Sequence, residues 1–446
     1  MSSTAEQLAS SMNMGAFGKA TELKKRIWFT LGALIVYRLG TYIPLPGIDP
    51  TVLKDIFSQN SGGILGMFDM FSGGALSRMT IFALNIMPYI SASIIMQLMT
   101  AISPKMEALK KEGESGRKKI NQYTRYGTVL IAGLQAFGIA AGLEGMTSSA
   151  GAAVADPGVF FRFTTVVTLV GGTMFLMWLG EQITARGVGN GISLIIFSGI
   201  VAQVPRALVG TLEMGRTGAL STLFILFLMV MAVGVIFFII FMERAQRRII
   251  IQYPKRQQGN KMTGGDSSHL PLKLNTAGVI PPIFASSILL MPITVIGFSA
   301  GTGPEWVTTA AAYLGRVQPL YLFLYMTFIV FFAFFYTSVV FNPTETADNL
   351  KKYGGFVPGI RPGKNTAQYL DRVLSRLTVV GAAYLAAVCL LPEILIANYS
   401  VPFYFGGTSL LIVVTVTMDT VAQVQSHLLA HQYEGLIKKS KLRGRR

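Results

Sequence analysis

Long uninterrupted apolar runs dominate the hydrophobic pattern of this chain. A helix that crosses a membrane needs about 20 consecutive apolar residues, and ten stretches approach or reach that length. They lie at approximately 27–43, 79–102, 126–146, 161–180, 191–209, 220–242, 276–298, 320–341, 373–396 and 407–429. Because a segment in lipid must satisfy its backbone hydrogen bonds internally, each stretch is predicted to be a helix. The pattern therefore predicts an all-α polytopic membrane protein with ten transmembrane helices.

The loops between these runs differ sharply in positive charge. Lys and Arg collect in cytoplasmic loops, and alternate assignment of the loops places 30 of the 38 Lys and Arg on one side and four on the other. Both termini are then predicted to be cytoplasmic. The polar N-terminal segment 1–26 runs into the first span without an A-x-A-like cleavage site, so we expect an uncleaved span. The net charge of +17 is explained first by the excess of Lys and Arg in the loops predicted to be cytoplasmic. It does not suggest a DNA-binding protein.

Composition agrees with a membrane protein. Hydrophobic residues make up 51% of the chain and charged residues only 13%, which is more apolar than a soluble core of this length requires. The single cysteine, Cys389, lies in an apolar run, so an internal disulfide is excluded.

One apolar segment is too short to cross a bilayer. Residues 63–78 read GILGMFDMFSGGALSR, an apolar run that a double glycine ends at about half the required length. By itself the segment is compatible with a re-entrant or interfacial helix that has no special role.

Two spans share a short internal repeat. Aligning Pro88 with Pro281 superposes MPYISAS on IPPIFAS, at the start of the second and the seventh span. Two successive halves of five helices each must lie in opposite orientations, and inverted repeats place the working site between the halves near the membrane midplane. Ile90 and Ile283 are then candidates to face each other there, although an isoleucine in a membrane helix more often touches lipid or a neighbouring helix.

The chain offers little catalytic chemistry. It contains no H-E-x-x-H, Walker A or G-x-S-x-G sequence, so it is not expected to be an enzyme, and no cofactor or metal is predicted. His427 and His431 have ligand spacing but no evident third ligand, so they are interpreted as interfacial. The stretch RGVGNG at 186–191 is predicted to be a tight turn between two spans. Asp419 is the one strong candidate for the mid-span carboxylate that a coupled transporter usually carries, but it is equally compatible with a bond inside its bundle or with cytoplasmic water.

Seven long stretches carry a resemblance to a known family. From about residue 23 to residue 439 the chain resembles the SecY family, the central channel subunits of the bacterial Sec protein translocase. The stretches are YRLGTYIPLPGID, MFSGGALSRMTIFALNIMPYISASIIMQL, KKEGESGRKKINQYTRYGT, MFLMWLGEQITARGVGNGIS, HLPLKLNTAGVIPPIFASSI, FNPTETADNLKKYGGFVPGIRPG and VPFYFGGTSLLI.

The resemblance implies two inverted five-helix halves around an hourglass pore. Unfolded secretory polypeptides are expected to cross the bacterial inner membrane through this pore, and membrane-protein segments to leave it sideways into lipid. The expected parts are a cytoplasmic segment 1–26, an N-terminal half 27–212, a C-terminal half 213–430 and a basic cytoplasmic tail 431–446.

The resemblance also assigns candidate residues to the pore. The short segment 63–74 is expected to be a plug helix that rests in the outer funnel. Its candidate residues are Ile64, Leu65, Met67, Phe68, Met70, Phe71, Gly73 and Gly74. The constriction is expected to be a ring formed by Ile86, Ile90, Ile192, Ile196, Ile283 and Ile412. A narrow ring of branched apolar side chains opposes ion flow by dewetting.

The sideways exit is expected between the second and third spans on one side and the seventh and eighth on the other. Ser91, Gln97 and Asn275 lie near that seam and are candidates to bond across it when it is shut.

Two long basic loops, 243–275 and 342–372, are expected to form a cytoplasmic docking platform. By resemblance they bind the motor ATPase SecA and the ribosome, whose RNA is an electrostatic partner for basic loops. The candidate docking residues are Arg247, Arg248, Lys255, Arg256, Lys261 and Arg361. Further expected partners are the small membrane subunits SecE and SecG, signal sequences, unfolded polypeptide and membrane lipids.

Two positions depart from the family pattern. Asn260 stands where one of two paired arginines is expected, and Asn85 stands where a small residue such as glycine is common. The alternative function is a secondary solute transporter with inverted repeats and basic cytoplasmic loops. A transporter requires a polar or charged site in the middle of the membrane, whereas the channel requires the isoleucine ring.

Overall fold

The structure is a computed structural model of the chain. It describes residues 21–49, 51–53, 69, 72–145, 147–148, 151–218, 221–254, 256–258, 261–263, 267–299, 309, 313, 318–399 and 407–443.

Helices make up most of the described chain. The N-terminal half contributes α3 (Thr21–Gly40), α6 (Met87–Ile102), α7 (Pro104–Lys111), α8 (Glu114–Glu144), α9 (Val159–Arg186) and α10 (Gly191–Arg216). The C-terminal half contributes α11 (Thr222–Arg244), α12 (Ile280–Ser299), α14 (Pro319–Val340), α15 (Pro343–Lys352), α16 (Lys364–Tyr399) and α17 (Gly407–Arg443).

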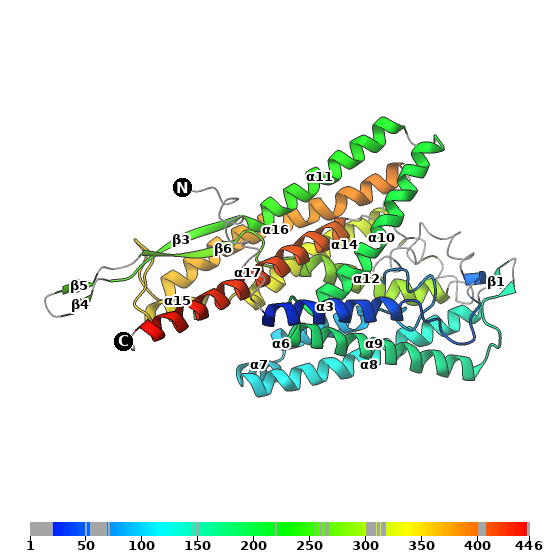
Figure 1. Cartoon of the computed structure of the whole chain (residues 1–446), viewed down its shortest axis with the longest axis horizontal. Coiled ribbons are helices and arrows are strands. Elements are labelled where there is room, and N and C mark those ends of the chain that lie inside the picture. The colour runs from blue at the N-terminus through cyan, green and yellow to red at the C-terminus, as the bar shows by residue number, and fades with distance from the viewer. Residues whose placement is uncertain are drawn as a thin grey trace.

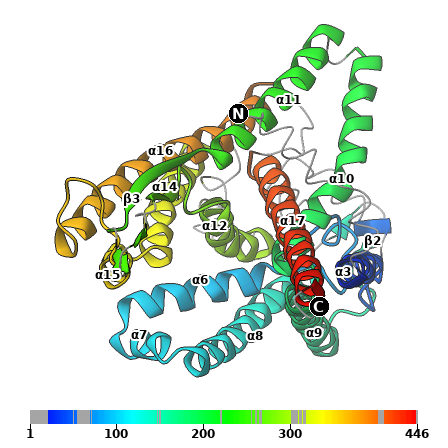
Figure 2. The same ribbon diagram turned by 60° about the vertical axis from the view of Figure 1, so that its left-hand side comes forward.

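The helices of the two halves lie in two groups. Figures 1 and 2 show α3, α6, α8 and α9 on one side of the molecule and α11, α14 and α16 on the other. Helix α10 leads from the first group towards the second and continues into α11. Helix α12 contacts α6 and α8 of the first group, and α17 contacts α3 and α10, so the halves meet along two lines.

Each of the ten predicted spans overlaps a helix. Among the described residues, seven helical stretches are long and apolar enough to cross a membrane, and α6 and the described part of α12 are shorter apolar helices. Helix α3 carries four basic residues, Lys24, Lys25, Arg26 and Arg38, and is not among the seven. A helical protein with several membrane-crossing segments is therefore established, and the count of ten spans stays a prediction.

In two predicted spans the helix begins several residues after the start of the apolar run. The span predicted from residue 79 is helical only from Met87, and the span predicted from residue 276 is helical only from Ile280. In both cases the aligned proline, Pro88 or Pro281, is the second residue of the helix. Proline is tolerated in the first turn of a helix because its missing N–H has no intrahelical partner there. The repeat thus marks the same structural position in the two halves.

Asn85 occupies a backbone conformation that explains its departure from the family pattern. Its φ angle is +50° and its side chain is buried, just before the start of α6. Glycine and asparagine are the residues that adopt this left-handed conformation most readily.

The loops between the helices contain β-structure, which corrects the purely α-helical prediction. Strands β3 (Gln246–Gln252) and β6 (Ser267–Lys273) form an antiparallel hairpin, β4 (Arg256–Gln258) pairs with β5 (Lys261–Thr263), and β1 (Thr147–Ser148) pairs with β2 (Gly151–Ala152). In Figure 1 the hairpin extends away from the helices at the same end as the C-terminus. Ile249 and Ile251 are buried and Ile250 between them is exposed, so the strand alternates in the structure although the sequence has three consecutive isoleucines. The β-branched run itself was the available signal in the sequence.

One large apolar cluster forms the core and includes residues of both halves. Its fully buried members include Tyr37 and Leu84 from the N-terminal half and Phe332 and Leu411 from the C-terminal half. A second, smaller cluster joins the β3–β6 hairpin to the start of α16 and the loop before it.

A pair of substitutions at Asn85 tests the backbone explanation. Asn85→Val places a β-branched residue in the left-handed region, at an expected cost of about 1–2 kcal/mol in the free energy of unfolding. Asn85→Gly keeps that backbone conformation and is expected to be more stable than the valine variant. Thermal unfolding in detergent measures both, and equal stability of the two variants would contradict the assignment.

Candidate functional site

The six predicted ring isoleucines come from four helices. Ile86 is the N-cap of α6, Ile90 lies in its first turn, Ile192 and Ile196 lie in the first turns of α10, and Ile283 and Ile412 lie near the starts of α12 and α17. All except Ile192 are less than 9% exposed and belong to the same apolar cluster, and Ile192 packs against that cluster. The structure thus brings side chains from both halves into one buried apolar region, and their role as a ring stays a prediction.

The predicted plug lies mostly outside the described residues. Ile64, Leu65, Met67, Phe68, Met70 and Phe71 are not described, whereas Gly73 and Gly74 at its end are. Both glycines have left-handed backbones, with φ of +67° and +84°. An ideal Cβ on Gly73 would lie 2.9 Å from Cα of Gly199 in α10, so glycine is required there for space as well as for conformation.

Polar contacts hold the chain at this double glycine. Arg38 Nη1 donates to the carbonyl of Gly73 at 3.2 Å, and the Tyr37 hydroxyl donates to the carbonyl of Ser72 at 3.4 Å. Asp69 Oδ1 accepts a hydrogen bond from the Ser77 amide at 2.6 Å. Burial raises the pKa of Asp69 above the usual carboxyl value, against the opposing effect of the Ser77 hydrogen bonds. The end of the predicted plug is therefore anchored to α3 and to the chain that follows it.

The segment before the predicted plug is anchored as well. The Leu45 amide donates to the Met79 carbonyl at 3.0 Å, the Asp49 amide to Ala153 at 3.1 Å, and the Ala155 amide to Gly47 at 3.1 Å. Residues 45–49 thus lie between the chain that follows the plug and the loop between α8 and α9.

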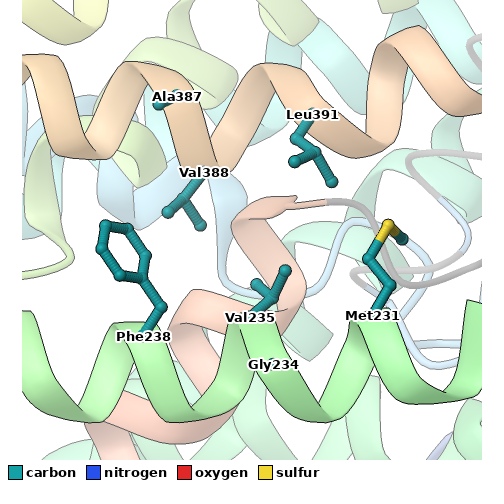
Figure 3. Close-up of a pocket in the computed structure, with 7 residues that line it drawn as sticks. All are labelled: Met231, Gly234, Val235, Phe238, Ala387, Val388 and Leu391. Atoms are coloured by element: carbon teal, nitrogen blue, oxygen red, sulfur yellow. The ribbon is translucent and has the colours of Figure 1, made fainter.

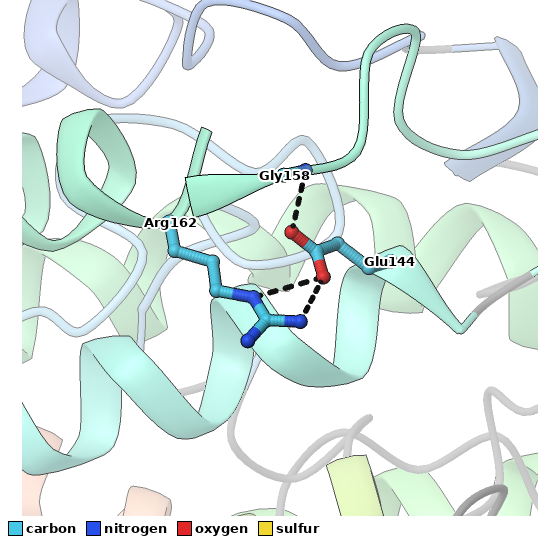
Figure 4. Close-up of polar contacts among 3 residues, drawn as sticks. All are labelled: Glu144, Gly158 and Arg162. Atoms are coloured by element: carbon cyan, nitrogen blue, oxygen red, sulfur yellow. Dashed lines mark hydrogen bonds and ion pairs between the residues drawn. The ribbon is translucent and has the colours of Figure 1, made fainter. Parts of the chain in front are cut away.

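An ion pair fixes that α8–α9 loop at both of its ends. Arg162 in α9 donates to Glu144 Oε2 from Nε at 2.9 Å and from Nη2 at 2.6 Å, and the Gly158 amide donates to Glu144 Oε1 at 3.1 Å (Figure 4). A two-donor arginine–carboxylate contact of this kind is more directional than a single ion pair. The segments on both sides of the predicted plug are therefore held on the N-terminal half.

The predicted gate residues lie where expected in sequence, but their hydrogen bonds stay within one half. Gln97 donates to Ser93 Oγ on its own helix at 3.3 Å, and Asn275 donates to Glu243 of α11 at 2.7 Å. Ser91 is buried in α6. The expected bonds across the seam are not among those of the described residues, and the gate assignment stays a prediction.

Two other polar residues lie where α12 meets α6 and α8, the contact that we call the seam. Ser287 of α12 donates to the Met87 sulfur of α6 at 3.5 Å, across the contact between the halves. Gln135 of α8, the helix that packs beside α6 and α12, is 3% exposed, and its Oε1 has no hydrogen-bond partner among the described residues. A buried amide inside an apolar span is unusual, and this was the signal in the sequence that could have identified Gln135.

The two predicted docking loops form one structural unit. Gln252 at the end of β3 exchanges two backbone hydrogen bonds with Phe356, at 2.9 and 3.0 Å. Ile249 and Leu272 of the hairpin pack with Val357, Leu370 and other apolar residues of the second loop and of α16. We call this unit, residues 246–273 with 342–372, the platform.

The predicted docking residues are distributed over the platform. Arg247 and Arg248 in β3 and Arg361 after α15 are exposed, and the Arg361 carbonyl accepts a hydrogen bond from Thr366 at 2.9 Å. Arg256 and Lys261 lie in β4 and β5, and Lys255 lies outside the described residues. Asn260 lies outside them too.

The cavity between α11 and α16 is apolar. It has a volume of about 310 Å³, and its lining residues point towards one another from the two helices (Figure 3). These residues are Met231, Gly234, Val235, Phe238, Ala387, Val388 and Leu391. Sites for small solutes carry placed polar groups among their apolar ones, and this lining has no polar side chain.

The remaining polar candidates do not form a site. Asp419 and His427 are exposed on α17, and the side chain of His431 lies outside the described residues. No group of His, Cys, Asp and Glu within the described part of the chain is arranged to hold a metal ion. The stretch 186–191 is a tight turn, as predicted, in which the Asn190 side chain caps α10 and Gln423 of α17 accepts a hydrogen bond from the Gly189 amide at 2.8 Å.

Comparison with known proteins decides the family. The family model for SecY matches residues 80–421. The chain belongs to the SecY family. The protein translocase subunit SecY of Escherichia coli K12 is 58% identical over 430 residues, which are 96% of this chain and 97% of that protein.

Solved structures share the fold of this SecY-family chain. One is a SecY protein whose plug domain is described as stabilising the closed state and maintaining a membrane seal, with a TM-score of 0.65 and 18% identity over 91% of this chain and 92% of that one. Another is Sec61 in a canine ribosome–channel complex from the endoplasmic reticulum, with a TM-score of 0.60 and 17% identity over the same shares.

A core substitution tests the platform as a unit. Leu370 lies in α16 and is fully buried against the hairpin and the second loop, so Leu370→Ala is expected to destabilise the platform by about 2–5 kcal/mol. Limited proteolysis should then cut both loops faster. Tyr353→Ala, at a side chain that is 77% exposed, is the control and should leave the cleavage rates unchanged. Faster cleavage of only one loop would show that the two fold separately.

A second substitution tests the double glycine. Gly73→Ala is expected to raise the resting ion conductance of the reconstituted channel several-fold, because the new methyl group meets Gly199 and Arg38. Gly113→Ala is the matched control, since Gly113 also has a left-handed backbone, with φ of +80°, but has open space around it. Equal conductance in the two variants would count against a role for the anchored glycines in the seal.

Proposed function

We propose that this protein is the channel through which unfolded secretory polypeptides cross the membrane, and that it is not an enzyme. Membership of the SecY family is the strongest support. The observation in the structure that carries the proposal is the buried apolar region to which α6, α10, α12 and α17 each contribute ring isoleucines. Such a region offers a passing chain no fixed polar partner, and its side chains part around residues of different size.

The proposed architecture is ten spans in two inverted halves, with both termini in the cytoplasm of a bacterial inner membrane. The equivalent positions of Pro88 and Pro281 support the repeat. Helix α10 runs to Arg216, past the half boundary proposed at residue 212, so we place the junction between the halves after α10 and before α11.

The proposed seal has two layers. The isoleucine ring excludes a continuous column of water and ions, and the plug at 63–74 covers it from outside. The contacts of Arg38 and Tyr37 at the double glycine, together with those of residues 45–49, support a plug whose two ends stay attached to the N-terminal half.

The proposed lateral gate is the contact of α12 with α6 and α8. Signal sequences and membrane-protein segments would leave the pore there into lipid. Ser91, Gln97 and Asn275 remain proposed gate residues, and the Ser287–Met87 contact supports a seam at this place.

The proposed partners follow from the platform and from the family. The exposed Arg247, Arg248 and Arg361 suit an acidic protein surface or ribosomal RNA. We assign the platform to the motor SecA and the ribosome, and we propose SecE and SecG as small membrane subunits of the complex.

The transporter alternative is not favoured. Asp419 is exposed on α17, and the cavity between α11 and α16 has an apolar lining. Neither provides the partly buried, polar mid-membrane site that a coupled transporter requires.

Cysteine crosslinking tests the channel directly. Cys389 is replaced by alanine, and Ile90→Cys or Ile283→Cys is introduced in the reconstituted complex. Both cysteines should crosslink to a secretory chain stalled in transit, because the chain must pass the apolar region. Phe237→Cys on α11, at a side chain that is 73% exposed, is the lipid-facing control and should not react. Reaction at Phe237 as strong as at both pore positions would remove the pore assignment.

A further inference from the structure

The junction between the platform and α12 contains a buried polar pair. Helix α11 ends at Arg244 and leads directly into β3, and β6 returns to Lys273 a few residues before α12 begins at Ile280. The Leu274 amide donates to the Ala245 carbonyl at 2.9 Å and closes the base of the hairpin. The residues that connect the hairpin to the proposed gate helix are therefore held beside the end of α11.

Asn275 and Glu243 form the pair. Asn275 Nδ2 donates to Glu243 Oε1 at 2.7 Å, and the two residues are 5% and 9% exposed. The same nitrogen donates to the Gly278 carbonyl at 3.0 Å. A hydrogen bond to a carboxylate at this distance and burial is among the stronger kinds, since water cannot replace either partner easily.

The surroundings of the pair are tight and specific. Gly278 has a φ of +62°, so the turn that the Asn275 side chain bridges needs a residue that adopts the left-handed region. Gly381 of α16 packs against the connection, and an ideal Cβ at this position would lie 3.0 Å from the Leu274 carbonyl oxygen. The amide of Asn275 is thus hydrogen-bonded to α11 and to its own turn, and α16 packs against the backbone beside it.

We infer that the Asn275–Glu243 pair is the joint that transmits movement of the platform to α12. This inference rests on the proposed function, because it assumes that a partner loads the platform and that α12 moves when the seam opens. The pair fixes where α12 starts relative to the hairpin, and α12 carries both Ile283 of the apolar region and Ser287 of the seam. Asn275 is then a positioning residue, and it acts inside the C-terminal half.

The alternative connection between platform and membrane runs through α16. The second platform loop leads into α16, and the main contacts of α16 among the described helices are with α14, α15 and α17. A force applied to the hairpin reaches α12 by the shortest covalent and hydrogen-bonded route through Asn275. Loss of the pair should therefore weaken coupling while leaving partner binding intact.

The test uses the complete complex in proteoliposomes with the motor SecA, ATP and a secretory protein. Asn275→Leu removes the amide at similar size. It should reduce motor-driven transport about tenfold, the scale of one lost charge-assisted hydrogen bond, with motor binding unchanged. Cysteines at Met87 and Ser287, in a background with Cys389→Ala, form a disulfide when the seam is closed. In the unmodified complex the motor should reduce the formation of this disulfide. Asn275→Leu should weaken that effect of the motor in parallel with transport.

A conservative change of the acceptor separates a joint from a general structural role. Glu243→Gln keeps an oxygen acceptor for the Asn275 amide and leaves the Asn275–Gly278 bond in place, so transport should stay within about threefold of the unmodified complex. Glu243→Leu removes the acceptor and should reduce transport about tenfold, as Asn275→Leu does. Thr276→Ala is the matched control, because its exposed hydroxyl bonds to the Lys273 carbonyl at the same connection, and it should change neither readout.

Three results would overturn the inference. They are transport unchanged by Asn275→Leu, loss of motor binding in proportion to loss of transport, and transport in Glu243→Gln no better than in Glu243→Leu. If the unmodified complex moves no secretory protein and its seam crosslink does not respond to the motor, the proposed function fails instead.

Discussion

The contact of two helical halves through one apolar cluster is the interaction on which the rest of this structure depends. Lipid tails are as apolar as the helices, so the hydrophobic effect does not hold the halves together inside a membrane, and close packing must do so. In this chain the packing includes the isoleucines of α6, α10, α12 and α17. Apolar contacts of this kind have no strong directional bond to break where α12 meets α6 and α8.

The polar contacts are arranged to leave that apolar contact free to open. Arg38, Tyr37 and the Glu144–Arg162 pair fix loops within the N-terminal half. The Asn275–Glu243 pair and the Gln252–Phe356 bonds fix the platform within the C-terminal half. Where α12 meets α6 and α8, the described polar contacts include the weak Ser287–Met87 one, whereas the second line of contact carries the Gly189–Gln423 hydrogen bond at 2.8 Å. This division suits two bodies that move relative to each other.

Hydropathy and charge predicted the helices well because the membrane imposes one simple rule on every span. All ten apolar runs overlap helices, and the aligned Pro88 and Pro281 both fall at the second position of a helix. The predictions were wrong at the starts of two helices and in the loops, where the need to satisfy the backbone in lipid does not decide the structure. The chain before α6 and α12 is apolar but not helical, because the prolines and the left-handed Asn85 set the helix starts. The hairpins lie outside the predicted spans, where hydropathy says nothing about strands.

The sequence by itself determined the class of the protein, its helices and the residue types that a seal requires, since these depend on local composition and on motif order. Only the tertiary structure decided which side chains meet. Gln97 bonds along its own helix, Asn275 bonds to Glu243 behind the seam, and two loops separated by the whole of α12 and α14 join into one platform. Such contacts link residues far apart in the chain, and their geometry follows from how whole helices pack, which no local pattern encodes.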